Sequence, residues 1–217
     1  VAGHEVLGLG VEQEDDGVRL DSPGLNNFFL DFYRVPDREP RPHRLHLDVF
    51  GGDRRDELVQ VALDAGAVHL DIGQGDVPWV VLGDPEDYAF RVMPQRRWYR
   101  DTGPIAGIPI DADDVPAANA FWREAFDWVA DDENIFRHPS GYGPLIAFTE
   151  PVEPKRGKNP MHLDLRVAPG QDYEAELARL LGLGARRLQH NWGELNWTVL
   201  VDPGNNEFCL LRPITAG

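Results

Sequence analysis

The chain is poor in positive charge, and this excludes two classes of partner. Of its 217 residues, 21 are lysine or arginine and 37 are aspartate or glutamate, so the formal net charge is −16. Lys155 and Lys158 are the only lysines. Because nucleic acids and anionic membrane surfaces are bound through cationic groups, we expect neither nucleic acid nor membrane as a partner.

Cysteine and long apolar runs are also scarce. Cys209 is the only cysteine, so the chain forms no disulfide within itself, and a cytoplasmic location is expected. No apolar run approaches the ~18–20 residues of a transmembrane helix, and no signal-peptide pattern is visible. The length suits one large domain or two of about 100 residues each.

What the sequence does contain is a repeat: short phrases of the first half recur, in the same order, 116 or 118 residues later. The matching phrases are His46-Leu47-Asp48 and His162-Leu163-Asp164, Gly66-Ala67 and Gly184-Ala185, Trp79 and Trp197, Asp84-Pro85 and Asp202-Pro203, and Phe90 and Phe208. Self-similarity at a fixed spacing indicates a duplicated structural unit. At the position just before the phenylalanine, the first copy has Ala89 and the second has Glu207. The glutamate can bind a metal or a proton, whereas the alanine can do neither.

The repeat and a polar, aperiodic segment divide the chain. We predict one domain over 1–93, a linker over 94–103 and a second domain over 104–217. The second domain is expected to open with a strand over 105–111 and a helix that begins near Pro116, capped by Asp113 or Asp114. The elements expected after that helix are strands at 134–137, 145–149, 161–167, 186–189, 197–201 and 207–211, with a helix at 173–183.

The first copy lacks the counterpart of that opening strand and most of its helix. By subtraction, roughly twenty residues would precede Val1. We therefore expect an N-terminally shortened, unresolved or degenerate first domain, with a sheet edge that something must pair or cover. The alternative is that a second chain supplies the strand, which would make the protein a homodimer.

Alternation along two strands separates polar from apolar side chains. In the second copy, His162, Asp164 and Arg166 share one face, and in the first copy His46 and Asp48 do. These faces are predicted to line a ligand cleft. The structural alternative is that the histidine bonds to a neighbouring strand and the aspartate pairs with an arginine.

Several aromatic residues and the cysteine leave similar alternatives open. The aromatic residues that can line an apolar cleft, or belong to the core, are Tyr142, Phe148, Trp192 and Trp197. Cys209 lies between Phe208 and Leu210 on an expected strand, where a cysteine is more often packing than a nucleophile. Asp202-Pro203-Gly204-Asn205 is expected to form a turn in which Gly204 or Asn205 takes a positive φ.

Four longer phrases carry a resemblance to a known family. These are DADDVPAANAFWREAFDW at 111–128, NPMHLDLRV at 159–167, LLGLGARRL at 180–188 and VLVDPGNNEFCLLRP at 199–213. They resemble the glyoxalase-like and bleomycin-resistance branch of the vicinal oxygen chelate superfamily. The resemblance implies an α+β protein with two tandem glyoxalase-like domains built from βαβββ modules. Each domain would curl a mixed sheet around a cleft.

The resemblance also implies where a metal would bind. Metal-dependent members commonly place a histidine on the first strand of each module and a glutamate on the last strand of the second module. His162 and Glu207 match two of these ligands, and Gly107 stands where a third would be. In the first copy His46 matches, but Ala89 replaces the glutamate. A divalent ion of Ni, Zn, Fe or Mn would thus have two protein ligands, whereas working sites usually have three or more.

From this incomplete ligand set we expect a protein that binds a small, partly apolar organic molecule in a cleft, without a catalytic metal. The acidic chain would suit a cationic ligand. The first alternative is a divalent-metal-dependent lyase, isomerase or dioxygenase whose activity lies in the C-terminal domain. The second alternative is a dimerisation module that has no ligand.

Overall fold

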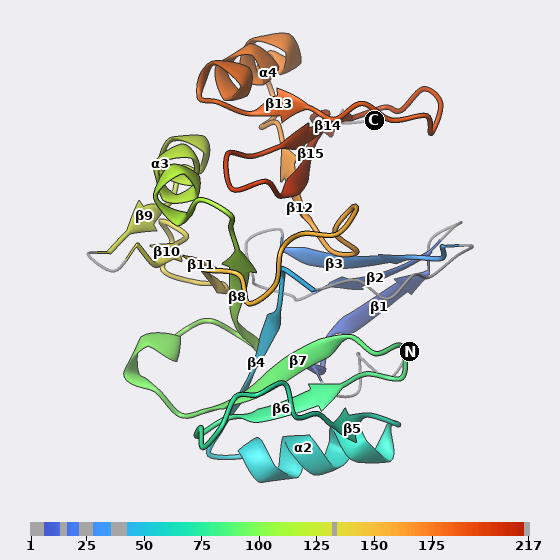
Figure 1. Cartoon of the computed structure of the whole chain (residues 1–217), viewed down its shortest axis with the longest axis vertical. Helices are drawn as coiled ribbons and strands as arrows, with labels where there is room; N and C mark the ends of the chain where they lie inside the picture. Colours follow the sequence, from blue (N-terminus) through green and yellow to red (C-terminus); the bar gives the residue numbers. More distant parts are fainter. Residues whose placement is uncertain (1–6, 14–16, 22–27, 36–42, 132–133, 215–217) are drawn as a thin grey trace. The chain divides into compact units, whose positions relative to one another are not determined.

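A computed structural model describes residues 7–13, 17–21, 28–35, 43–131 and 134–214 (Figure 1). The chain packs into two compact units: Val1–Pro40, His46–Pro109 and Ile135–Ala147 form the first, and Arg41–Leu45, Ile110–Asn134 and Phe148–Gly217 the second. Each unit takes residues from both predicted domains, and the domain boundaries stay a prediction. None of the helices in the described part of the chain has the length and apolar character needed to cross a membrane.

The first unit contains a small sheet and most of a large one. The small sheet is antiparallel, in the order β1-β2-β3, and consists of β1 (Gly10–Gln13), β2 (Gly17–Asp21) and β3 (Phe29–Tyr33). The large sheet has the order β5-β6-β7-β4-β8-β11-β10-β9. Its strands are β4 (Leu47–Gly52), β5 (Val68–His69), β6 (Val80–Gly83), β7 (Ala89–Pro94), β8 (Ile105–Asp111), β9 (Val129–Ala130), β10 (Phe136–Arg137) and β11 (Leu145–Thr149). Helix α2 (Arg55–Asp64) follows β4.

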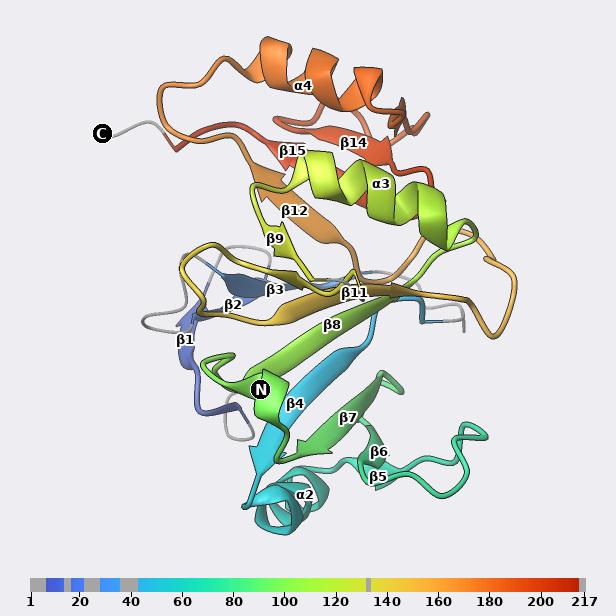
Figure 2. The ribbon, with the colours of Figure 1, turned by 90° about the vertical axis from the view of Figure 1, so that its left-hand side faces the viewer.

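The second unit contains two helices and a four-stranded sheet in the order β12-β15-β14-β13. Its strands are β12 (Leu163–Arg166), β13 (Arg186–Arg187), β14 (Thr198–Val201) and β15 (Glu207–Leu211). The helices are α3 (Val115–Ala125) and α4 (Tyr173–Gly182), and α4 lies across β14 and β15 (Figure 2). The short helix η1 (Arg97–Tyr99) belongs to the first unit.

The structure confirms the α+β repeat. β4-α2-β5-β6-β7 and β12-α4-β13-β14-β15 have the same order of elements, and in each the first strand pairs in parallel with the last. A third copy of the pattern is β8-α3-β9-β10-β11. These are the βαβββ modules expected from the resemblance. The described strands form open sheets.

Side-chain caps set where the two helices of the second unit begin. The Ala117 amide donates to Asp114 Oδ1 at 2.9 Å, and the Ala175 amide donates to Asp172 Oδ1 at 2.7 Å. Each bond satisfies an amide that has no partner within its helix. The predicted strand over 105–111 is present as β8, and the predicted cap Asp114 is confirmed. The predicted strand over 161–167 is shorter in the structure, at Leu163–Arg166.

Candidate functional site

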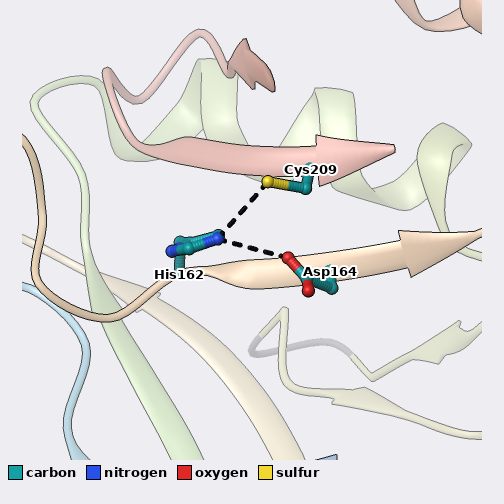
Figure 3. A group of neighbouring side chains, drawn as sticks. All are labelled: His162, Asp164 and Cys209. Atoms are coloured by element: carbon teal, nitrogen blue, oxygen red, sulfur yellow. Dashed lines mark hydrogen bonds and ion pairs between the residues drawn. The ribbon is translucent and has the colours of Figure 1, made fainter. Parts of the chain in front are cut away.

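Three side chains meet on one face of the four-stranded sheet (Figure 3). They are Asp164 of β12, Cys209 of β15 and His162, which directly precedes β12. His162 Nε2 lies 3.3 Å from Asp164 Oδ1 and 3.4 Å from Cys209 Sγ. All three possible ligand atoms are within 4.8 Å of one another. The side chains of His162 and Asp164 are 27% and 38% exposed, whereas Cys209 is 5% exposed. The cluster is therefore open to solvent on the β12 side and closed at β15.

The opposite, apolar face fixes the orientation of this cluster. Strand alternation places Leu163 and Leu165 on that face, paired in register with Phe208 and Leu210 of β15. Helix α4 covers β15 there, and the Tyr173 hydroxyl donates to the Leu210 carbonyl at 3.1 Å. Because Phe208 and Leu210 are each 1% exposed on this face, His162, Asp164 and Cys209 point to the other side.

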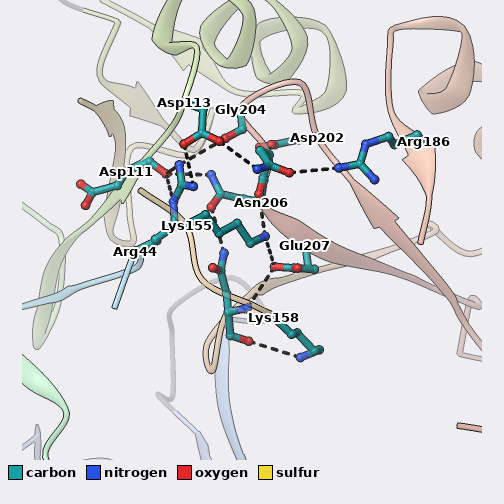
Figure 4. Close-up of polar contacts among 12 residues, drawn as sticks. Arg44, Asp111, Asp113, Lys155, Lys158, Arg186, Asp202, Gly204, Asn206 and Glu207 are labelled. Carbon is teal, nitrogen blue, oxygen red and sulfur yellow. Dashed lines mark hydrogen bonds and ion pairs between the residues drawn. The ribbon is translucent and has the colours of Figure 1, made fainter. Parts of the chain in front are cut away.

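The predicted partner of His162, Glu207, is held by other groups. Its Oε2 atom lies 2.7 Å from Lys155 Nζ and accepts a hydrogen bond from the Asn159 amide at 3.1 Å (Figure 4). The carboxylate side chain is 6% exposed. Burial lowers the pKa of Lys155, and Glu207 opposes that shift. β12 and β15 are neighbours, as the pairing of His162 with Glu207 requires. In the described part of the chain, however, the hydrogen bonds and ion pairs of Glu207 go to Lys155 and Asn159 and those of His162 to Asp164 and Cys209.

A second polar network in the same unit immobilises the loop before β15 (Figure 4). Arg44 is 1% exposed, donates to the Asp111 carbonyl at 2.9 and 3.0 Å, and pairs with Asp113 at 2.9 Å. The Asn206 amide group donates to the same carbonyl at 2.8 Å. The start of β15, and with it Glu207, is thus fixed by buried hydrogen bonds.

The turn at 202–205 forms as expected, with separate roles for its last two residues. Asn205 has a φ of 67°, which confirms one of the two predicted positions. Gly204 is needed for space, because a Cβ atom there would lie 2.8 Å from Ala112 Cβ and 3.0 Å from Ala118 Cβ. The turn can therefore approach the start of α3 closely only with glycine at this position.

An exposed aromatic residue and a lysine contact one another in the second unit. The rings of His190 and Trp192 stack with centroids 4.8 Å apart and an interplanar angle of 9°. Lys158 Nζ lies 5.7 Å from the centre of the Trp192 ring. Burial raises the pKa of Cys209, and the charge of Lys158 opposes that shift. Trp192 is 48% exposed and offers a ligand an aromatic surface.

In the first copy, the aspartate that corresponds to Asp164 is buried. Asp48 is 5% exposed, and its Oδ1 atom lies 2.6 Å from Arg91 Nε. Burial raises the pKa of Asp48, and Arg91 opposes the shift. Asp48 pairs in register with Gly107, whose position brings no side chain. The role predicted for His46 and Asp48 in a cleft stays a prediction, and the Arg91 pair leaves Asp48 little room for a ligand.

The remaining predicted residues are scattered. Arg166 donates to the Arg212 carbonyl at 2.9 Å, at the far end of β12. Trp197 and Tyr142 are 41% and 53% exposed. Phe148 is 7% exposed and stacks on Trp122 with centroids 6.0 Å apart, so its alternative assignment to the core is correct. A hollow of about 270 Å³ in the first unit is lined by Gly52, Asp53, Arg55, Asp56, Pro94 and Gln95, outside the predicted cleft residues.

Cys209 is expected to be unreactive in the native protein. Burial, and secondarily the negative charge of Asp164, raise the pKa of its thiol. Since the thiolate is the nucleophile, alkylation by iodoacetamide at pH 8 should be at least about 100-fold slower in the native chain than in urea. Mass spectrometry gives both rates without ambiguity, because the chain has no other cysteine. Equal rates in the two states would show that the thiol is exposed and ionisable.

Comparison with known proteins places this geometry in a family. The family model of the glyoxalase-like domain matches residues 4–93 and 107–211. A single-residue variant of glyoxalase I from Zea mays has a similar structure, with a TM-score of 0.67 and 14% identity over 97% of this chain and 86% of that one. A candidate dioxygenase from Bacillus subtilis gives a TM-score of 0.63 and 12% identity over 96% and 78%. At these identities the structures show a common fold. None of the curated protein sequences compared with the chain matches it.

The metal pair implied by this fold does not fit the contacts of the chain. A cation between His162 and Glu207 would have to displace Lys155 from a carboxylate it approaches to 2.7 Å. It would otherwise stand beside a buried ammonium group of the same sign. The donors that the structure brings together are instead His162, Asp164 and Cys209. This set of donors could not be predicted from the sequence, because strand alternation gives the face on which each residue lies but not the register between two strands.

Proposed function

Because this chain belongs to the glyoxalase-like domain family, we propose that its second unit binds a small, partly apolar organic molecule on the polar face of the β12–β15 sheet. The observation that carries the proposal is the exposed Trp192 ring, which stacks on His190 with centroids 4.8 Å apart. The Lys158 ammonium group lies 5.7 Å from the centre of the same Trp192 ring. An aromatic surface and polar groups are thus available to one ligand.

The aromatic part of the site is arranged in advance. Stacking on His190 restricts the orientation of the Trp192 ring while about half of the residue stays accessible. A side chain that is already ordered loses little conformational entropy when a ligand binds to it. Trp192 is therefore suited to stack against a flat apolar group.

The polar part favours a ligand that carries a cationic or hydrogen-bond-donating group. The Asp164 side chain is 38% exposed and can accept such a group, and His162 beside it is 27% exposed. The net charge of −16 attracts cations over a longer range. Recognition of this kind uses only side chains of the protein and needs no metal ion.

The test is a thermal-shift screen of small aromatic compounds with and without an amine, followed by calorimetry. A compound that binds the native state raises the Tm by mass action. Trp192→Ala should raise the Kd about tenfold or more, because an exposed aromatic anchor and its cation–π contact are lost. Trp98→Ala is the matched control, since Trp98 is 42% exposed and belongs to the first unit.

Two results would count against the proposal. If no compound shifts the Tm, the alternative of a module without a ligand is favoured. If a compound binds equally well to Trp192→Ala, Asp164→Asn and the wild type, its site lies elsewhere on the chain.

A further inference from the structure

We propose that His162, Asp164 and Cys209 form a binding site for a thiophilic divalent cation such as Zn²⁺. The site shares His162 and Asp164 with the polar face proposed for the organic ligand. It differs from the His162–Glu207 pair implied by the fold because Asp164 and Cys209 take the place of Glu207. It rests on the arrangement of the three donor atoms around the His162 ring (Figure 3).

The spacing of the donor atoms suits a tetrahedral ion. With bonds of about 2.0–2.3 Å to nitrogen, oxygen and sulfur, the ligand atoms of a tetrahedral zinc site stand roughly 3.3–3.8 Å apart. His162 Nε2 is already 3.3 Å from Asp164 Oδ1 and 3.4 Å from Cys209 Sγ. A cation can therefore be bound with small movements of side chains.

Hydrogen bonds join the three donor atoms of this cluster only in pairs. If Nε2 carries a proton, it can be donated well to the carboxylate or to the sulfur, but not to both. If Nε2 is unprotonated and accepts the thiol hydrogen, its lone pair also faces the carboxylate oxygen. A cation among the three atoms is attracted to the imidazole nitrogen, the carboxylate and the thiolate at once.

The donor types indicate which cation would bind. A thiolate with an imidazole favours zinc and other borderline or soft ions, whereas Mg²⁺ and Ca²⁺ prefer sets made of oxygen alone. Three protein donors leave a fourth position for water or for another donor. The exposure of His162 and Asp164 places that open position on the solvent side of the cluster.

The site is displaced along the sheet from the pair that the fold implies. Asp164 lies two residues after His162, Cys209 lies two residues after Glu207, and Asp164 and Cys209 pair in register. The cation would thus lie toward the Cys209 end of the face, while Glu207 keeps its pair with Lys155. The pair between Lys155 and Glu207 and the cation site can then exist together.

Binding of the cation must remove a proton from the thiol. Burial and Asp164 raise the pKa of Cys209, whereas Lys158 acts to lower it. Since the metal replaces that proton, the affinity should increase with pH, by up to about tenfold per pH unit below the thiol pKa.

The test uses Co²⁺ as a spectroscopic substitute for Zn²⁺ on the whole chain. Because Cys209 is the sole cysteine, a thiolate-to-cobalt charge-transfer band at one equivalent can arise only from this residue. Cys209→Ser should abolish the band, and His162→Gln and Asp164→Asn should each raise the Kd about 10- to 100-fold. Addition of Zn²⁺ should remove the band from the wild type.

Glu207→Gln separates this site from the pair implied by the fold. It should keep the band, provided that circular dichroism shows the variant to be folded, and loss of the band from the folded variant would overturn the proposal. Cobalt bound without a charge-transfer band would also overturn it, because the 37 acidic residues would then be holding the ion non-specifically. These readouts do not depend on the organic ligand, so the two proposals can fail separately.

Discussion

Replacement of Glu207 by alanine is expected to lower the Tm of the second unit by roughly 10 °C. The substitution leaves the Lys155 ammonium group, whose side chain is 11% exposed, without its buried counter-charge. Breaking a buried ion pair from one side costs about 3–5 kcal/mol, and each kcal/mol lowers the Tm of a chain of this size by about 2–4 °C. The Asn205 carbonyl, 2.6 Å from Lys155 Nζ, would remain as a partner and moderate the loss.

Two further variants identify the cause of that loss. Glu153→Gln is the matched control, because the Glu153 side chain is 56% exposed and lies 3.6 Å from Arg156 at the surface. It should leave the Tm unchanged within error. The double variant Lys155→Met with Glu207→Leu should recover most of the stability, since no buried charge is left alone. Failure of the double variant to recover would show that packing, and not charge, is responsible.

Replacement of Trp122 by alanine is expected to destabilise the same unit by about 3–5 kcal/mol, as for other large-to-small changes in a core. Trp122 is 1% exposed and packs against Phe126 in a tilted arrangement with centroids 4.6 Å apart. It also meets Phe208 edge to face at 5.1 Å, which connects α3 to β15. The measurement is the midpoint of urea unfolding, with circular dichroism as the probe.

Trp122→Phe separates the hydrogen bond from the packing. The indole Nε1 donates to Asp202 Oδ2 at 2.7 Å, and burial raises the pKa of that carboxyl group. Phenylalanine keeps most of the aromatic contact but removes the donor, so the expected cost is about 1–3 kcal/mol. Trp192→Ala should leave the midpoint unchanged because that ring is 48% exposed. An equal loss in the alanine and phenylalanine variants would assign the whole effect to the hydrogen bond.

The fold could be predicted because local signals agree with the repeat. Asp114, followed by proline near the start of an apolar stripe, gives both the start of α3 and the face that it buries. The recurrence of His-Leu-Asp on two strands predicts that β4 and β12 occupy equivalent positions in their modules, and the structure confirms this. The repeat in the sequence therefore predicts the order of helices and strands, although it does not predict which side chains contact one another.

The contacts within the candidate site could be predicted only in part. Alternation places His162, Asp164 and Cys209 on corresponding faces, but their meeting depends on the parallel register of strands about 45 residues apart. The pairing of Lys155 with Glu207 depends on how the segment before β12 folds back over β15, and no periodic pattern describes that. The sequence shows that the chain has only two lysines, but it does not show that Lys155 is buried or that it pairs with Glu207.

The position of β12 in its sheet has a mechanical consequence. Among the described residues, β12 pairs with β15 alone, whereas its equivalent β4 is bonded to β7 on one side and β8 on the other. Strand β12, which carries Asp164 and directly follows His162, is thus held in its sheet by a single ladder of hydrogen bonds, the one to β15. Any change that loosens β15 will also spread the three donor atoms apart. The rigidity of the candidate site is therefore that of its weakest strand pairing, and it should decline before the core around Trp122 unfolds.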